Sequence, residues 1–395
     1  MAGTVVGYVL SDMPRSSSLL DADASYSSIA NVVNGVLLVA VVAAVCAASP
    51  ISGRAQLGAG LASLIVITLG AVGAVPESVA PWTSPAAAGA LLGVAALLAG
   101  NARPAQATLV LGVVGFGALG STLDDRLRYI PPATAELGWT ANAIPVDQGL
   151  PERTLIIVTL AIVTGVLMAF TKYVDSGVSN PRLLVVGVLL PVAGSVAAWV
   201  STAHPSDDVV WYLAIAGLTV VTLLSAFALR GRDGVLILAL FATTGAAFGS
   251  TMWSQSSWGQ VSILFALLIL GGAIGYLLPN VYVGLAVLAL GPVASLLFDG
   301  DLASLASFLL FPFAVGYVVV SALAVTTGVV GPAAVVPFTM MLPVTVYAAG
   351  AQLGTGVEVE SFVGDSNPTG SALSISGMAV VAVCAAGVAT ARRRA

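Results

Sequence analysis

A proline-rich apolar run near the C-terminal end combines freed backbone carbonyls with hydroxyl side chains. Pro332, Pro337 and Pro343 fall within the apolar run 329–353. Each proline lacks the N–H that would bond the carbonyl four residues earlier in a helix, so that carbonyl loses its usual donor. Inside a membrane such carbonyls must face protein, water or a ligand, because lipid offers no donor. They could bind a neutral solute, or hold a sodium ion together with hydroxyls.

Hydroxyl groups in the same region complete a candidate substrate-binding site. Its residues are Pro337, Thr339, Pro343, Thr345 and Tyr347, with Tyr317 from the preceding apolar run. A competing interpretation is that the prolines only kink helices and shape their packing, since proline is ordinary in membrane helices. No catalytic residue, metal site or cofactor is predicted.

Two acidic pairs outside the apolar runs could hold a divalent metal for transfer from a lipid-linked sugar. They are Asp124–Asp125 and Asp207–Asp208, and the second pair lies close to His204, the only histidine in the chain. The competing interpretation is a hydrated acidic surface, and the other loops predicted on that face share this acidity. An enzyme therefore ranks behind the other hypotheses.

Charged side chains are absent from the interior of the apolar runs. No Asp, Glu, Lys, Arg or His lies well inside any of them. Charges inside a membrane mark proton relays, ion sites and voltage sensors. Their absence argues against a proton-driven pump, an aspartyl intramembrane protease and a voltage-gated channel, and leaves a carrier of neutral or amphipathic molecules.

The elements that must position these groups are membrane-spanning helices. Of 395 residues, 58% are hydrophobic and 8% are charged, whereas a soluble domain carries about 25% charged residues. A helix needs about 20 apolar residues to cross a bilayer. Such runs lie near 29–49, 55–75, 84–101, 104–122, 154–174, 183–202, 209–229, 234–252, 260–278, 281–298, 302–325, 329–353 and 371–391. The sequence predicts an all-α, polytopic transmembrane helix bundle of about 13 spans, or 11 if the third and fourth runs form a re-entrant hairpin.

Positive charges sort between alternate loops. One set of loops and the C-terminal tail hold nine of the thirteen Lys and Arg residues, and the other set holds four with sixteen of the eighteen acids. Cytoplasmic loops carry the excess of Lys and Arg. The N-terminus is therefore predicted outside and the C-terminus, with Arg392, Arg393 and Arg394, in the cytoplasm of a cell membrane. The acidic outer face and the single lysine, Lys172, give a halophile-like composition, for which a GC-rich genome is the alternative explanation.

An internal repeat is predicted from residues that recur at one ungapped offset. A shift of 129 places Pro76 on Pro205, Trp82 on Trp211 and Arg103 on Arg232. The predicted organisation is an extracytoplasmic N-terminal tail at 1–28, a four-span repeat at 29–122, an external loop at 123–153, a second repeat at 154–252, a weaker third copy at 260–353, an external loop at 354–370, and a last span with a basic tail at 371–395. Four spans is an even number, so the copies would share their orientation, as in parallel-repeat transporters.

Small residues at four-residue spacing predict where helices approach closely. The pairs are Gly89 and Gly93, Gly245 and Gly249, Gly271 and Gly275, and Gly350 and Gly354. Cys46 and Cys384 lie inside apolar runs and are expected to be small core residues rather than a disulfide.

Two hypotheses lead on these grounds. The first is a permease- or flippase-like transporter of a small neutral or amphipathic solute, which rests on the repeat and the interrupted helices. The second is a non-catalytic membrane subunit or scaffold of an envelope complex, which rests on the lack of polar chemistry. Membrane lipids are expected partners, and nucleic acid is not.

Overall fold

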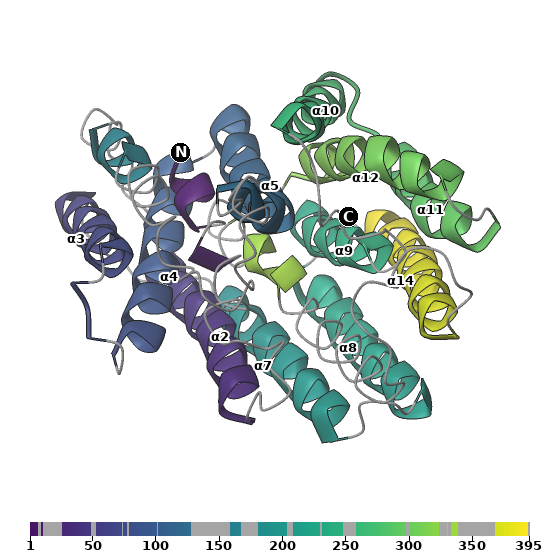
Figure 1. Cartoon of the computed structure of the whole chain (residues 1–395), viewed down its shortest axis with the longest axis horizontal. Helices are drawn as coiled ribbons and strands as arrows, with labels where there is room; N and C mark the ends of the chain where they lie inside the picture. The colour runs from purple at the N-terminus through teal and green to yellow at the C-terminus, as the bar shows by residue number, and fades with distance from the viewer. Residues whose placement is uncertain are drawn as a thin grey trace, which may run out of the picture.

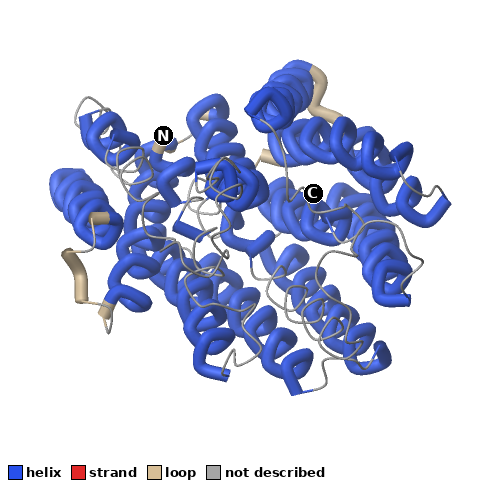
Figure 2. Tube along the Cα trace, viewed as in Figure 1, coloured by secondary structure: helices blue, strands red, loops and turns tan. Residues whose placement is uncertain are grey.

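The structure, a computed structural model, describes residues 1–6, 9–10, 26–48, 53–72, 74–76, 79–100, 102–127, 159–166, 181–203, 208–229, 231–247, 258–297, 301–323, 330, 333–338 and 368–393. Within these ranges the regular elements are helices, and no strand occurs (Figure 2). All thirteen predicted runs meet helical residues, although 154–174 and 329–353 do so only at 159–166 and at 330 and 333–338. The predicted all-α polytopic bundle is confirmed.

The helices carry the labels of Figure 1. They are α2 (Tyr26–Ala48), α3 (Gly53–Ala71), α4 (Ala80–Ala99), α5 (Arg103–Leu127), α7 (Pro181–Ala203), α8 (Asp208–Leu229), α9 (Gly231–Ala247), α10 (Trp258–Leu277), α11 (Val281–Leu297), α12 (Asp301–Ser321) and α14 (Pro368–Arg393). Proline opens α7 and α14, where its missing N–H costs nothing because the first turn has no intrahelical acceptor for it. Charged residues of these helices stand in the first or last turn, so that the apolar middle of each helix faces lipid or other helices.

Four described helical stretches are long and apolar enough to cross a bilayer by themselves. They are Ala80–Ala99, Asp208–Leu229, Gly259–Leu277 and Leu373–Arg393. Five shorter apolar stretches, of 10 to 17 residues, come from α2, α3, α7, α11 and α12. Because a bilayer core is about 30 Å thick and a helix rises 1.5 Å per residue, the longer stretches alone cover that thickness.

The pattern of burial separates central helices from peripheral ones. In α8 the buried residues recur every three or four positions, at Trp211, Ile215, Leu218, Thr222 and Ser225. Its opposite face leaves Leu213 and Leu224 exposed, at 68% and 61%. Apolar side chains exposed on one helix face are expected at a lipid boundary. In α9, by contrast, every residue from Gly234 to Ala246 is buried, so this helix lies inside the bundle.

The helices gather into two groups, on the left and right of Figure 1. In the first group α2 packs on α4 and α7, and α3 packs on α4. In the second, α10 and α11 pack on α12, while α14 packs on α8, α9 and α11. Contacts of α5 with α4 on one side and with α10 and α12 on the other join the groups, as do contacts of α7 with α8.

Glycines set the closest helix pairs, as their spacing predicts. A Cβ atom on Gly89 of α4 would lie 2.5 Å from the Val39 carbonyl oxygen of α2, and one on Gly93 would lie 2.9 Å from that of Ala43. A step of four residues along α4 therefore corresponds to a step of four residues in the same direction along α2, so the two helices run parallel. A Cβ on Gly245 would meet Val380 of α14 at 2.6 Å. Gly249, Gly350 and Gly354 lie outside the described residues.

The pair α10 and α12 repeats this parallel arrangement. Gly271 faces the Phe313 carbonyl, and a Cβ atom on Gly275 would lie 2.5 Å from the Tyr317 carbonyl oxygen. Gly316 of α12 in turn faces the Leu268 carbonyl of α10. Backbones this close cannot accept a side chain between them, so small residues on both helices are required here.

The ends of three helices meet on one face of the bundle. The Tyr317 hydroxyl, near the end of α12, donates to the carbonyl of Leu278 in the α10–α11 turn, at 2.7 Å. The Arg392 guanidinium, at the end of α14, lies 4.9 Å from the ring centroid of Tyr282 at the start of α11. The ends of α12 and α14 therefore lie on the same face of the bundle.

Some helix contacts are those that the predicted four-span repeat requires in both copies. In the first copy α4 packs on α3 and α5, and in the second α8 packs on α7 and α9. The helix at 159–166 departs from the correspondence, because a Cβ on Gly165 would contact Leu61 and Leu64 of α3. The repeat therefore stays a prediction.

A short helical turn at the N-terminus has no counterpart among the predicted spans. Residues 2–6 are helical, and Val5, Val6 and Leu10 are no more than 2% exposed. They belong to the same apolar core as α5 and α9. The sequence predicts a tail for residues 1–28, because so short an apolar stretch is not recognised as a membrane span.

Candidate functional site

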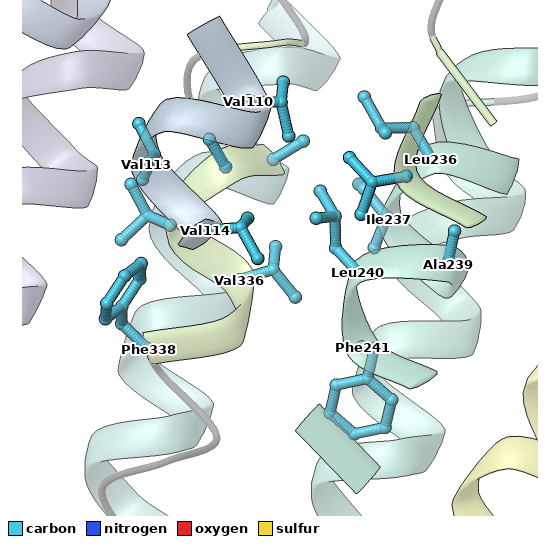
Figure 3. Packing of buried hydrophobic residues seen from close by; sticks show 14 of the residues in the cluster. Val110, Val113, Val114, Leu236, Ile237, Ala239, Leu240, Phe241, Val336 and Phe338 are labelled. Atoms are coloured by element: carbon cyan, nitrogen blue, oxygen red, sulfur yellow. The ribbon is translucent and has the colours of Figure 1, made fainter. Parts of the chain in front are cut away.

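The described part of the proline-rich segment lies in the middle of the bundle. Residues 330 and 333–338 are buried, and Val330, Ala334 and Val335 are fully so, at 0% exposure. Figure 3 shows Val336 and Phe338 beside Val110, Val113 and Val114 of α5, with Leu236, Ile237, Leu240 and Phe241 of α9 close by. The segment therefore faces protein rather than lipid.

One polar contact links this segment to α9. The Thr244 hydroxyl lies 3.3 Å from the Leu240 carbonyl oxygen in its own helix and 3.5 Å from the Pro337 carbonyl oxygen. Both distances are long for a hydroxyl donor, whose usual range ends near 3.0 Å. Pro337 itself offers no N–H to the carbonyl of Ala333. The segment thus holds one carbonyl oxygen, that of Ala333, that lacks its helical donor, inside an apolar surround.

Tyr317 has a hydrogen-bond partner outside the proline-rich segment. Its hydroxyl donates a hydrogen bond to the Leu278 carbonyl. Its ring stacks on Phe313 at a centroid distance of 6.4 Å, and the residue is 7% exposed. A Cβ on Gly284 would meet this ring at 2.8 Å. These contacts hold α12 to the α10–α11 turn. The other predicted members of the site, Thr339, Pro343, Thr345 and Tyr347, lie outside the described residues.

Two buried polar atoms were missed by the sequence interpretation. The Gln106 side chain, 1% exposed, donates from Nε2 to the Gly100 carbonyl at 2.7 Å, and its Oε1 has no partner among the described residues. The Ser225 hydroxyl of α8 likewise has none. A buried polar atom left unpaired costs about 1–3 kcal/mol, so water or a ligand is the expected partner. A lone glutamine in an apolar run could have been noticed, whereas a serine gives no such signal.

The position of Gln106 relates it to the central segment. In a helix, residues three, four and seven positions apart share one face. Gln106 therefore lies on the face of α5 that carries Val110 and Val113, one turn nearer to the start of the helix. Its free oxygen is an acceptor on the same side of α5 as the proline-rich segment.

The metal hypothesis for the acidic pairs finds no support within the described part of the chain. No group of three or more His, Cys, Asp or Glu residues that could hold a metal ion occurs there. Asp124 and Asp125 stand in the last turn of α5, and Asp208 is the first residue of α8. His204 and Asp207 lie outside the described residues. Cys46 and Cys384 are free thiols.

Comparison with known proteins identifies a fold. No family model matches the chain, and no curated protein matches it. Among solved structures, FucP, a Major Facilitator Superfamily transporter in its outward conformation, matches with a TM-score of 0.52 and 12% identity, covering 100% of this chain and 98% of FucP. A variant of the E. coli fucose:proton symporter FucP matches with a TM-score of 0.53 and 12% identity, covering 100% and 97%.

The likeness over the whole chain shows the fold alone: a polytopic helical membrane bundle. Those transporters are 12-helix bundles, and the sequence predicts 11–13 spans here. At 12% identity the likeness carries no residue roles from one chain to the other.

Proposed function

We propose that this protein is a membrane transporter of a small neutral or amphipathic solute. The observation that carries the proposal is the match of the entire chain to the bundle of two transporter structures. The buried proline-rich segment between α5 and α9 supports it, because interrupted helices near the middle of a bundle supply backbone oxygens to a substrate. Pro337, and with it Thr339, Pro343, Thr345 and Tyr347, would line the path.

A neutral cargo and an energy source other than a proton relay fit the charge distribution. The neighbouring structure is a fucose:proton symporter. Proton coupling within a membrane relies on an ionisable group there, and the described helices carry their Asp and Glu residues only in terminal turns. The Ala333 carbonyl, which lacks its helical donor, and the Gln106 Oε1, which has no partner among the described residues, can accept hydrogen bonds, so a solute with hydroxyl or amide donors fits this interior best.

Uptake into proteoliposomes tests the proposal. Neutral sugars, with fucose first, and neutral amphipathic solutes are offered with and without an imposed pH gradient. We expect uptake of at least one solute, at a rate that the pH gradient leaves unchanged. If no solute in the panel enters above the rate of empty liposomes, the scaffold hypothesis takes its place.

A proline double variant tests the path. Pro337→Ala with Pro343→Ala restores two helical donors, so we expect it to change the uptake rate more than the yield of folded protein. Pro85→Ala in α4 is the matched control, because it also replaces a buried proline inside a helix. Equal uptake by the double variant, the control and the parent protein would remove the segment from the path.

We propose further that the N-terminus is outside and the C-terminus cytoplasmic. The support is the excess of Lys and Arg in one set of loops. A reporter fused to the C-terminus should be active only in the cytoplasm, and a cysteine in place of Ser366 should react with an impermeant reagent from outside. A further reporter at the N-terminus settles the parity of the spans, since an even number would put both termini on one side.

A further inference from the structure

Residues 1–6 and 9–10 are the described part of a short internal element. Residues 2–6 make a helical turn, in which the Thr4 hydroxyl donates to the Met1 carbonyl at 2.6 Å and the Val5 amide donates to the same carbonyl at 3.2 Å. Val5, Val6 and Leu10 are 2%, 0% and 2% exposed. Side chains as apolar as these would be exposed in a free tail, and burying each contributes about 1.5–3 kcal/mol.

The turn meets α5 backbone to backbone. A Cβ atom on Gly112 would lie 3.0 Å from the Thr4 amide nitrogen and 3.1 Å from the Gly3 carbonyl carbon. Gly3 faces the Leu109 carbonyl, and a Cβ atom on Gly3 would lie 3.2 Å from the Val113 nitrogen. Because glycine stands on both sides of the contact, the turn can approach α5 more closely than any other residue type would permit.

The contact lies deep in the bundle. Leu109 and Val113 are six and ten residues from the start of α5, which places them about 9–15 Å along its axis. The short turn around Gly100 joins the end of α4 to the start of α5, and α2 runs parallel to α4. The start of α2 at Tyr26 is therefore on the face opposite to the start of α5.

The turn covers the helix that the candidate path uses. Val113, which Gly3 contacts, lies beside Val336 and Phe338 in Figure 3. We propose that residues 2–6, together with 9 and 10, are an internal plug that closes the solute path over α5, so that transport requires these residues to leave. This inference rests on the proposed function and adds its regulation. The free energy of opening is raised by such a plug only to the extent of the contacts that the plug loses when it leaves.

Accessibility of a single cysteine tests the plug without reference to transport. Val113→Cys is introduced in a chain in which Cys46 and Cys384 are alanine, and the purified full chain in nanodiscs is treated with a water-soluble maleimide. Deletion of residues 2–10 and the single change Gly3→Leu should each speed labelling by about tenfold or more, the factor given by a 1.4 kcal/mol shift in the opening equilibrium. Gly58→Leu is the matched control, because nothing lies within 4 Å of a Cβ atom there.

Four outcomes are distinguishable. Labelling of Val113→Cys that stays as slow after the deletion as before overturns the plug. Labelling that rises equally at Leu238→Cys, a fully buried position on α9, overturns it too, because a plug leaves without unfolding the bundle. Faster labelling at Val113→Cys alone, with faster solute uptake by the deleted form, supports both proposals. Faster labelling at Val113→Cys alone with no uptake by either form leaves the removable cover over α5 standing, but refutes the transporter and with it the role of that cover in transport.

Discussion

The parallel pair of α10 and α12 offers the sharpest test of how this bundle is held together. An alanine at Gly275 would place its Cβ atom 2.5 Å from the Tyr317 carbonyl oxygen and 3.0 Å from the Tyr317 Cα, whereas ordinary contact begins near 3.4 Å. The helices must therefore separate by about 0.9 Å. The opposing atoms are backbone, so no rotamer change relieves the contact. The Tyr317 hydroxyl also ties the end of α12 to Leu278, which resists the shift.

Separation on this scale weakens the packing along the whole pair. A gap of 0.5–1 Å forfeits roughly a quarter to a half of each dispersion contact, and overpacked cores lose about 1–3 kcal/mol. We expect Gly275→Ala to lower the free energy of unfolding by about 1–3 kcal/mol relative to Gly217→Ala, a helical glycine with nothing within 4 Å of its Cβ position. Comparing two Gly→Ala changes removes the gain of up to about 1 kcal/mol in helix propensity that both share.

Unfolding by SDS titration of the purified protein in mixed micelles, followed by tryptophan fluorescence, gives the two free energies. A difference below about 0.5 kcal/mol, which is outside the overpacking range, would mean that α10 and α12 are not in backbone contact at Gly275. The reasoning behind the small-residue spacing at Gly271 and Gly316 would then fail as well.

Two further substitutions probe contacts between distant parts of the chain. The Trp211 Nε1–H donates to the Ser376 hydroxyl at 3.0 Å. A double-mutant cycle of Trp211→Phe and Ser376→Ala should therefore give a coupling free energy of about 0.5–1.5 kcal/mol in the same titration. A coupling near zero would mean that α8 and α14 are not in contact at these two residues. Tyr317→Phe removes the donor to Leu278 and should cost about 1 kcal/mol of stability. Because that hydroxyl donates to a backbone carbonyl of the protein, its removal should leave the affinity for solute unchanged. A weakened affinity would indicate that Tyr317 contributes to the binding site.

The candidate site was predictable only in part. The prolines and the lack of interior charge directed attention to 329–353, and the described residues of that run prove to be buried between α5 and α9. Tyr317 was grouped with them because its run comes immediately before theirs. Its hydroxyl donates to the α10–α11 turn, a partner that order in the sequence does not reveal. Gln106 and Thr244 were not selected, because whether a polar side chain has a partner depends on what packs against it.

The sequence by itself determined the helices, their approximate ends and the glycines at which they approach. The reason is local: in lipid each backbone group must bond within its own segment, so an apolar run of sufficient length has one stable form. Only the tertiary structure decided which helices touch. The bond from Trp211 to Ser376 spans 165 residues, and apolar runs of nearly equal composition give no preference among partners. The buried N-terminal turn belongs with these, because two glycines far apart in the chain permit it and neither predicts the other.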